Sequence, residues 1–409
     1  MAKISSHACY EVMLNYTCNA RCMFCSQGNF DKARLGTFAQ TARSIYLAKQ
    51  QGYKRIGFTG GDPLVSPDIL KAVTLAKKAG FPFIRVQTNG IRLGDMDFCE
   101  KLAAAGLTLC KFSFGSDIPA EHDRLFGVKG AFERSVSGLK RLRELKVRVS
   151  VNILITKLTY FRLADIIRSF LAMGVRNFII VYPLYIGSMY RNHEELGIPL
   201  EACTQPFSEA SELMESIGLG GEILFLNVPA CFLKGRESLS IGLNPFNTVV
   251  MDPDGNKTDL DDNSASDRTH VPGCEKCRLK DRCAGLQNSY IELFGDKVYP
   301  LSDSKGQETP QEQSCCKMPR NTEQGTAQVS NRPQFMTENE ECLFEILKDG
   351  KEKSTAEVLE AARHIALCKD CTDGNSVMNT GSKLEKQGYI VRRFEKGKYY
   401  WKLAVSSDQ

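Results

Sequence analysis

The sequence has no uninterrupted run of 18 apolar residues, and Met1-Ala2-Lys3-Ile4-Ser5 lacks the apolar segment of a secretory signal. We therefore expect no transmembrane helix, no export signal and a cytoplasmic protein. Strong charge is also absent. The net charge of +5 gives no electrostatic argument for nucleic acid or a membrane surface as partner. The 42% hydrophobic and 25% charged content is ordinary for a globular protein, and 409 residues predict two or three domains.

Cysteine is abundant, with 16 residues in the chain. A disulfide framework would require an oxidising compartment, which no other feature of the sequence supports. Seven of the cysteines fall in two metal-ligand patterns. The remaining nine are expected to be small buried apolar residues or unmodified thiols. These are Cys9, Cys99, Cys110, Cys203, Cys315, Cys316, Cys342, Cys368 and Cys371.

The first cysteine pattern is Cys18, Cys22 and Cys25, which follows the apolar run at residues 11–16. Three thiolates on one tight loop can hold three irons of a four-iron, four-sulfur cluster and leave the fourth iron without a protein ligand. A substrate can chelate that open iron, whereas a cluster that only transfers electrons is usually closed by a fourth cysteine. Zinc sites normally show paired Cys-x-x-Cys units, which this triplet does not match. The pattern therefore favours a catalytic 4Fe-4S cluster over a zinc loop.

This spacing resembles the radical S-adenosylmethionine (radical SAM) superfamily. The resemblance implies that the amino and carboxylate groups of SAM bind the open iron. It also implies that one electron from the reduced cluster cleaves SAM to methionine and a 5′-deoxyadenosyl radical. Phe24, the residue before the last cysteine, would then lie near the adenine.

Residues 9–184 repeat one theme, an apolar strand-like run followed by a helical pattern. The predicted strands are Cys9–Tyr16, Lys54–Thr59, Phe83–Thr88, Thr108–Phe114, Val147–Thr156 and Arg176–Leu184. Alternating strands and helices predict a parallel α/β sheet with right-handed crossovers. Six such units suit the partial (βα)6 TIM-like barrel of this superfamily. Ligand sites in parallel α/β folds gather at the carboxyl ends of strands, where the cysteine loop begins.

Thr59-Gly60-Gly61-Asp62-Pro63 follows the second predicted strand. It resembles the Gly-Gly-Glu-Pro motif whose backbone and acid hold the SAM amino group, with Asp62 in place of Glu. The glycines predict a close approach of the backbone to a ligand, and Pro63 a rigid exit. A plain strand-to-helix turn is the alternative. After the third strand, Gln87-Thr88-Asn89-Gly90 predicts a turn with Asn89 in the left-handed region.

Ser113 and Arg124, by position, look like the pair that contacts the SAM carboxylate in this family. A planar guanidinium suits a carboxylate because it can bind both oxygens. Phe114-Gly115-Ser116 departs from the Leu-Asp-Gly of the family, so the match is partial, and a surface ion pair is the alternative for Arg124. His122 is interpreted as a structural histidine. Asn152, a polar residue inside the fifth strand, is predicted to meet a ligand, and the resemblance suggests the SAM ribose.

A second pattern comprises Cys231, Cys274, Cys277 and Cys283. Between the first two lies a hairpin signal around Pro253-Asp254-Gly255. The segment resembles Twitch, the shorter form of the SPASM extension, which implies one auxiliary 4Fe-4S cluster closed by four cysteines. Gln287 stands where a further cysteine would begin a second auxiliary cluster. A four-cysteine zinc ribbon remains the alternative.

The tail is polar over residues 302–334, which predicts a linker containing the vicinal pair Cys315-Cys316. The pair could bind a soft metal or act as a redox pair; two idle thiols are favoured. From residue 335 the pattern predicts three short helices and a strand pair, interpreted as a winged helix. Residues 383–402 carry seven Lys or Arg against two Glu. Nucleic acid, a peptide and packing on a neighbour all remain open uses, and nucleic acid is not favoured.

The predicted organisation is a radical SAM barrel core (1–190), an α+β auxiliary-cluster domain (191–300), a linker (301–334) and a winged-helix-like domain (335–409). The predicted function is a radical SAM enzyme with two 4Fe-4S clusters, SAM, and a flavodoxin- or ferredoxin-type reductant. The preferred substrate is a peptide or protein side chain presented by the tail. The alternatives are a small molecule, or a DNA-binding iron–sulfur sensor, against which the intact Gly60-Gly61-Asp62-Pro63 argues.

Overall fold

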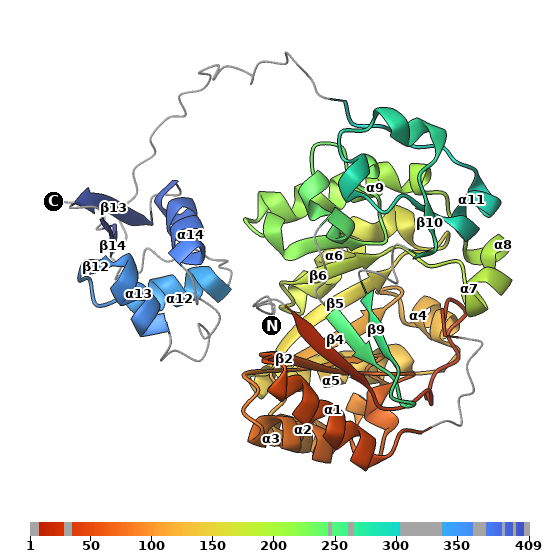
Figure 1. Cartoon of the computed structure of the whole chain (residues 1–409), viewed down its shortest axis with the longest axis horizontal. Coiled ribbons are helices and arrows are strands. Elements are labelled where there is room, and N and C mark those ends of the chain that lie inside the picture. Colours follow the sequence, from red (N-terminus) through yellow and green to blue (C-terminus); the bar gives the residue numbers. More distant parts are fainter. Residues whose placement is uncertain are drawn as a thin grey trace, which may run out of the picture. The chain divides into compact units, whose positions relative to one another are not determined.

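The structure is a computed structural model that describes residues 8–27, 35–243, 248–260, 266–302, 338–362, 374–386, 389–395 and 398–404. The chain divides into two compact units (Figure 1). The first holds Met1–Ser216 and Gly220–Asp303, and the second holds Ile217–Leu219 and Ser304–Gln409. Both cysteine patterns lie in the first unit. No helix in the described ranges is long and apolar enough to span a membrane.

The first unit is built on a nine-stranded sheet in the order β7-β6-β5-β4-β3-β2-β1-β8-β9. Its strands are β1 (Cys9–Met13), β2 (Arg55–Thr59), β3 (Phe83–Thr88), β4 (Leu109–Phe114), β5 (Arg148–Leu154), β6 (Phe178–Val181), β7 (Ile223–Leu226), β8 (Thr248–Met251) and β9 (Lys257–Asp259). Strands β1 to β7 pair in parallel, β8 pairs in parallel with β1, and β9 is antiparallel to β8. The six predicted strands and their parallel pairing are confirmed.

Helices connect consecutive strands of the barrel. They are α1 (Phe38–Gln50), α2 (Ile69–Lys78), α3 (Met96–Ala105), α4 (Pro119–Phe126), α5 (Ala131–Glu144) and α6 (Leu163–Ala172). Helix α6 illustrates why these segments form helices that pack on the sheet. Its apolar residues recur at helical spacing and are all buried: Leu163, Ile166, Ile167 and Phe170. Helix α3 begins where the side chain of Asp95 accepts a hydrogen bond from the Phe98 N–H.

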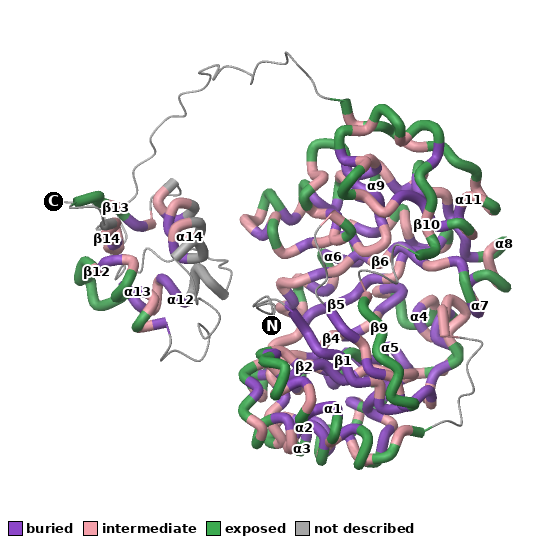
Figure 2. Tube along the Cα trace, viewed as in Figure 1, coloured by how far each residue is buried: buried purple, intermediate pink, exposed green. Residues whose placement is uncertain are grey.

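The two faces of the sheet differ sharply in chemistry, as β4 illustrates. Cys110, Phe112 and Phe114 are completely buried, and the Phe114 ring lies 4.5 Å from that of Phe170 in α6. Lys111 and Ser113 alternate with them, point to the opposite face and stay partly exposed. We call this opposite face the inner face of the barrel. Figure 2 shows the buried strands at the centre of the unit, with exposure on the outward sides of the helices.

The segment after β6 completes the first unit. It contains α7 (Gly187–Arg191), α8 (His193–Leu196), the predicted helix α9 (Leu200–Ser216), β10 (Arg268–Thr269), β11 (Leu286–Gln287) and α11 (Asn288–Phe294). The predicted hairpin is present as β8 and β9, and Asp252 closes its turn by accepting hydrogen bonds from the N–H groups of Asp254 and Asn256, both 2.8 Å. Because β8 pairs with β1, barrel and auxiliary segment share one sheet.

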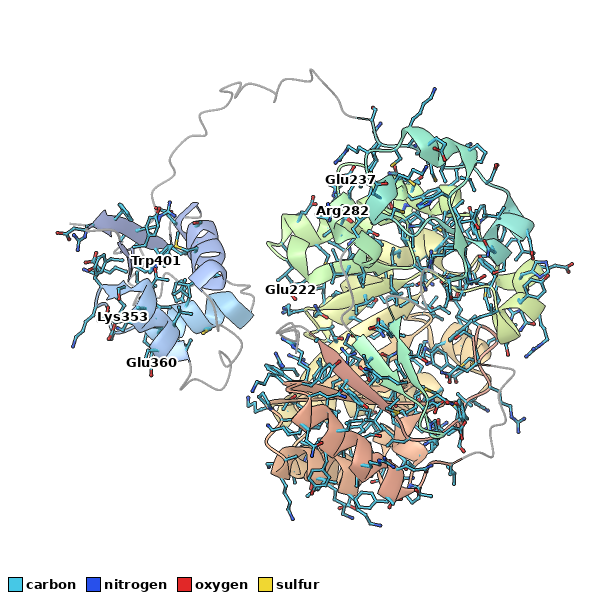
Figure 3. The ribbon with its side chains drawn as sticks, viewed as in Figure 1. Glu222, Glu237, Arg282, Lys353, Glu360 and Trp401 are labelled. Carbon is cyan, nitrogen blue, oxygen red and sulfur yellow. The ribbon has the colours of Figure 1, made fainter. Side chains whose placement is uncertain are left out.

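The second unit contains α12 (Glu338–Leu347), β12 (Lys353–Ser354), α13 (Thr355–Ala362), α14 (Gly374–Lys386), β13 (Ile390–Glu395) and β14 (Lys398–Leu403). Its antiparallel sheet has the order β12-β14-β13. Trp401 is fully buried, and its indole N–H donates to Thr355 Oγ1 at 2.9 Å (Figure 3). The predicted helices and strand pair are present, and their interpretation as a winged helix stays a prediction.

Two cysteine predictions in the tail have different outcomes. Cys342, expected to carry an unmodified thiol, is disulfide-bonded, and that expectation was wrong. Its spacing to the other cysteines follows no recognisable pattern, so no local signal predicts the bond. Cys315 and Cys316 lie outside the described residues, as does most of the predicted linker.

Candidate active site

The loop that carries Cys18, Cys22 and Cys25 begins at the carboxyl end of β1 and is anchored by backbone hydrogen bonds from distant segments. The N–H groups of Arg21 and Met23 donate to the carbonyls of Phe126 and Leu125 at the end of α4, both at 2.9 Å. The N–H of Ser188 in α7 donates to the Cys25 carbonyl at 2.8 Å. The loop is therefore positioned by the fold itself. None of its three cysteines forms a disulfide.

Hydrogen-bond donors also approach the sulfur of Cys18. The Ala20 N–H lies 3.4 Å from it and Asn89 Nδ2 lies 3.6 Å from it. Such bonds stabilise thiolates and tune iron–sulfur clusters. Asn89 was expected to adopt the left-handed conformation; that prediction was wrong, because Gly90 takes it, with φ of 79°. The side-chain amide of Asn89 also donates to Asn19 Oδ1 in the cysteine loop, at 2.8 Å.

Gly60 and Gly61 lie at the carboxyl edge of the sheet, as predicted. The close neighbour that requires glycine there is the backbone of the cysteine loop, not a ligand. A Cβ at Gly60 would lie 2.3 Å from the Asn15 carbonyl oxygen, and one at Gly61 would lie 2.3 Å from that of Thr17. The Gly61 and Asp62 N–H groups donate to these same carbonyls at 2.9 and 2.8 Å. The glycines therefore let the motif pack against the stem of the cysteine loop, and their predicted contact with a ligand stays a prediction.

The Asp62 side chain braces the same edge from inside. It is 1% exposed. Its oxygens accept hydrogen bonds from the Leu64 N–H at 2.9 Å, the Thr88 hydroxyl at 2.7 Å and the Asn89 N–H at 2.8 Å. Burial raises the pKa of Asp62 to about 6, against the lowering effect of these bonds. The carboxylate thus ties the ends of β2 and β3 together, and its role toward a ligand amino group stays a prediction.

Of the three remaining predicted SAM contacts, two lie side by side and the third lies apart. Ser113 and Asn152 are register partners on β4 and β5 and share the inner face. Asn152 is 7% exposed, and its Oδ1 has no hydrogen-bond partner among the described residues. Arg124 lies at the end of α4, 60% exposed at its side chain, and pairs with Glu195. This is the surface ion pair that the sequence left open. A carboxylate contact from Arg124 would require that pair to break.

Two aromatic side chains of α4 shape the surroundings of the loop. Phe24 packs edge to face on Phe126, with ring centroids 5.2 Å apart. His122 is completely buried and stacks on Phe126 at 4.1 Å. Burial lowers the pKa of His122 to about 4, so the imidazole is neutral at pH 7. This agrees with the structural role predicted for His122.

The second cysteine set is brought together from distant parts of the chain. Cys231, Cys274, Cys277 and Cys283 line one hollow with about 420 Å³ of atom-free space, part of it open to solvent. Its wall is largely apolar, with Leu279, Leu286, Val298 and Leu301 among the lining residues. In the described part of the chain, no three His, Cys, Asp or Glu side chains close on one point as a single metal ion would require.

The surroundings of these thiols affect how readily they ionise. Burial raises the pKa of Cys231 to about 11 and also raises the pKa of Cys283. Backbone N–H groups donate to both, that of Gly285 to Cys283 Sγ at 3.4 Å and that of Tyr299 to Cys231. Metal binding requires thiolates, so a cationic centre would have to offset the burial penalty. A partly buried, four-thiol site with N–H donors fits an iron–sulfur cluster.

Sequence reasoning missed a group of charged residues on the inner face. Glu11 of β1 is 6% exposed, forms an ion pair with Arg85 of β3 and accepts a hydrogen bond from Cys9 Sγ. Lys111 of β4 lies near this pair. The signal was available, because each charge interrupts an apolar strand at an alternating position. The group is taken up below.

Comparison with known proteins identifies the family to which the region around the cysteine loop is similar. A family model described as the Radical SAM superfamily matches residues 12–170. Residues 12–170 form a radical SAM domain. The match includes the cysteine loop, the Gly60-Gly61-Asp62-Pro63 motif and strands β2 to β5.

Curated relatives match the radical SAM domain region at low identity. The PqqA peptide cyclase of Gluconobacter oxydans is 26% identical over 186 residues, which are 45% of this chain and 51% of that protein. The molybdenum cofactor biosynthesis protein 1 of Homo sapiens is 31% identical over 144 residues, 34% of this chain and 22% of that protein. The chain thus spans about half or less of the length of these relatives.

Solved structures show the fold over a longer stretch. SuiB of Streptococcus suis bound to the precursor peptide SuiA matches with a TM-score of 0.56 and 13% identity, covering 71% of this chain and 74% of that one. The protein anSMEcpe with bound AdoMet matches with a TM-score of 0.52 and 14% identity, covering 72% and 93%. The partial TIM-like barrel predicted from the sequence is confirmed.

Proposed function

We propose that this chain is a radical SAM enzyme whose catalytic 4Fe-4S cluster is held by Cys18, Cys22 and Cys25. One observation carries the proposal: a rigidly anchored loop presents three thiols at the carboxyl edge of the barrel, inside a radical SAM domain. When bound, such a cluster supplies one-electron reduction of SAM to a 5′-deoxyadenosyl radical that takes a hydrogen atom from a substrate carbon.

The residues around the loop have the properties that this chemistry needs. Asn89 donates toward Cys18, and the packing of Gly60 and Gly61 fixes the loop stem. The unpartnered Oδ1 of Asn152, beside Ser113, is an acceptor suited to a hydroxyl of the SAM ribose. Phe24 offers an aromatic ring for the adenine. The protein's work is to orient SAM and to exclude competing reactions.

We propose a second, closed 4Fe-4S cluster in the hollow lined by Cys231, Cys274, Cys277 and Cys283. Four thiols leave no open iron, so this centre would relay electrons or brace the substrate site rather than cleave SAM. The apolar wall of the hollow supports this assignment, because it keeps water from the centre. A flavodoxin- or ferredoxin-type protein would supply the electrons, and the reducing cytoplasm is the compartment that suits both centres.

The proposed substrate is a peptide or protein side chain. The names of similar proteins support it: a PqqA peptide cyclase, SuiB with its precursor peptide, and anSMEcpe with a peptide. The molybdenum cofactor protein keeps a small-molecule substrate as the alternative. The second unit is proposed as a winged-helix-like substrate module. Nucleic acid stays disfavoured, because Arg392 pairs with Glu385 and Arg393 pairs with Glu352.

The proposed function is tested by anaerobic reconstitution with iron and sulfide, reduction with dithionite, and incubation with SAM. The expected product is 5′-deoxyadenosine, and the Cys22→Ala variant should give none. A protein that fills with iron yet yields no 5′-deoxyadenosine would overturn the proposal and favour the sensor alternative. Zinc in place of iron would overturn the cluster assignments as well.

A further inference from the structure

A row of polar side chains crosses the inner face of the sheet from β3 to β5. Parallel register places Gln87, Lys111 and Ser150 side by side on three neighbouring strands. The next row toward the carboxyl ends holds Ser113 beside Asn152. Because side chains alternate along a strand, all five project from the face opposite to the helices. The radical chemistry proposed above assigns no role to the first row.

This part of the inner face is open to a ligand. Strands β3 and β4 are central in the sheet, with a paired neighbour on each side. Even so, Gln87 is exposed and Lys111 is partly exposed, whereas Thr88 and Cys110 on the helix-covered face are buried. The accessible surface of Gln87 and Lys111 must therefore come from space in front of the inner face.

Lys111 lacks an anionic partner within the described residues. Its nearest carboxylate neighbour, Glu11, already pairs with Arg85 and accepts from Cys9 Sγ. The Glu11 carboxylate lies against Gly57, where an added Cβ would come within 2.1 Å of Glu11 Oε2. Burial and the nearby Arg85 lower the pKa of Lys111 to about 8. The ammonium is thus mostly charged at pH 7, and a partly desolvated charge without a partner is costly.

Two neighbours of Lys111 also carry unsatisfied polar atoms. Ser150 is 2% exposed and Asn152 is 7% exposed, and neither Ser150 Oγ nor Asn152 Oδ1 has a hydrogen-bond partner in the described part of the chain. Buried polar atoms without partners are rare in folded proteins, and they mark places where a ligand or water completes the bonding. Here they adjoin an ammonium that also needs a partner.

We propose that Lys111 and Ser150 form an anion-binding subsite that anchors a carboxylate of the substrate. Lys111 supplies the charge and Ser150 a hydroxyl donor, a set suited to a single carboxylate. Asn152, assigned above to the SAM ribose, lies two residues farther along β5 than Ser150, about 6.6 Å away along the strand, so the subsite adjoins the proposed SAM site. Lys111 is therefore a specificity-determining residue for acidic substrates.

This inference rests on the proposed function, because it calls the bound molecule a substrate, but its test does not require turnover. The probes are N-acetyl-L-glutamate methylamide and its glutamine counterpart, which differ only in the side-chain charge. N-acetylglycine is the third probe and carries a terminal carboxylate instead. Binding to the anaerobic full-length protein is measured by ligand-detected NMR and by the shift in Tm. The variants are Lys111→Met and, as a matched charge change, Lys101→Met, an exposed residue of α3 paired with Asp97.

The wild-type protein and Lys101→Met should bind the glutamate probe at least tenfold more tightly than the glutamine probe. Lys111→Met should lose this discrimination, and without a probe its Tm should rise by about 2 to 4 °C, since it removes an unpaired, partly desolvated charge. Tighter binding of N-acetylglycine would support an anion-binding subsite, and would indicate that it binds the carboxylate of a chain terminus and not that of a glutamate side chain. Equal binding of all three probes, or a lower Tm in Lys111→Met, would overturn the inference. Wild-type protein that still makes 5′-deoxyadenosine would then retain the proposed function.

Discussion

The two cysteine sites of this molecule are built on opposite plans. Cys18, Cys22 and Cys25 lie within eight residues of each other, on a loop held by backbone hydrogen bonds from α4 and α7. The second set joins Cys231 to a segment more than 40 residues away, around a hollow with an apolar wall. The first site is preorganised by the protein and has one thiol too few to close a cluster. The second has four thiols. The difference teaches that the first site suits a reaction and the second an electron relay.

The largest effect is expected from Cys22→Ala. The variant should lose about half of its iron, since the auxiliary site still fills, and its 5′-deoxyadenosine formation should fall to that of a protein-free control. Iron analysis and product quantification by liquid chromatography check this. Retained 5′-deoxyadenosine formation would place the catalytic centre elsewhere.

Cys277→Ala tests the second cysteine site independently of the first. It should also lose about half of the iron, yet cleavage of SAM in the absence of substrate should persist, because the loop does not depend on the hollow. The same two assays decide it. If SAM cleavage disappears together with the iron, the two sites are not independent as the structure suggests.

Gly61→Ala tests how the first site is preorganised. A methyl group there would meet the carbonyl oxygens of Thr17 and Tyr16 at 2.3 and 2.4 Å. The free energy of unfolding should fall by about 2 to 3 kcal/mol, which urea titration measures. Gly221→Ala is the control, because no atom lies within 4 Å of its added Cβ and its φ is not positive. Equal effects of the two substitutions would contradict the close packing of the motif on the loop stem.

An effect of similar size, spread over a range of pH, is expected from Asp62. Its pKa rises from 3.8 in the unfolded chain to about 6 in the folded one, so the folded state binds the extra proton between these values. The stability this contributes is complete below about pH 4 and is lost as pH rises to about 6, by at most about 3 kcal/mol. Urea unfolding of wild type and Asp62→Asn across this range should show the slope only in the wild type. A parallel pH profile in both proteins would mean that Asp62 does not carry the shift.

The sequence predicted the barrel well because its signals are local. Alternating apolar runs located β1 to β6, and three closely spaced cysteines located the candidate catalytic loop. Long-range features were less accessible. Nothing local indicates that β8 pairs with β1, or that β7 extends the sheet beyond β6.

Single residues show the same limit at the site. The motif around Asp62 was predicted at the correct edge, but only the structure shows its carboxylate bound to Thr88 and Asn89 inside the protein. Arg124 was predicted as a carboxylate contact because the sequence cannot reveal that Glu195 faces it. Lys111 was missed, although its alternating position in an apolar run indicates the face it occupies, because the sequence does not show what lies opposite.

The central claim is that one cluster leaves an iron open to SAM and the other does not. Electron paramagnetic resonance of the dithionite-reduced protein, with and without SAM, tests it most directly. One of two cluster signals should change on SAM addition, and that signal should be absent in Cys22→Ala and present in Cys277→Ala. A spectrum that SAM leaves unchanged, or a SAM-sensitive signal that survives Cys22→Ala, would contradict the account.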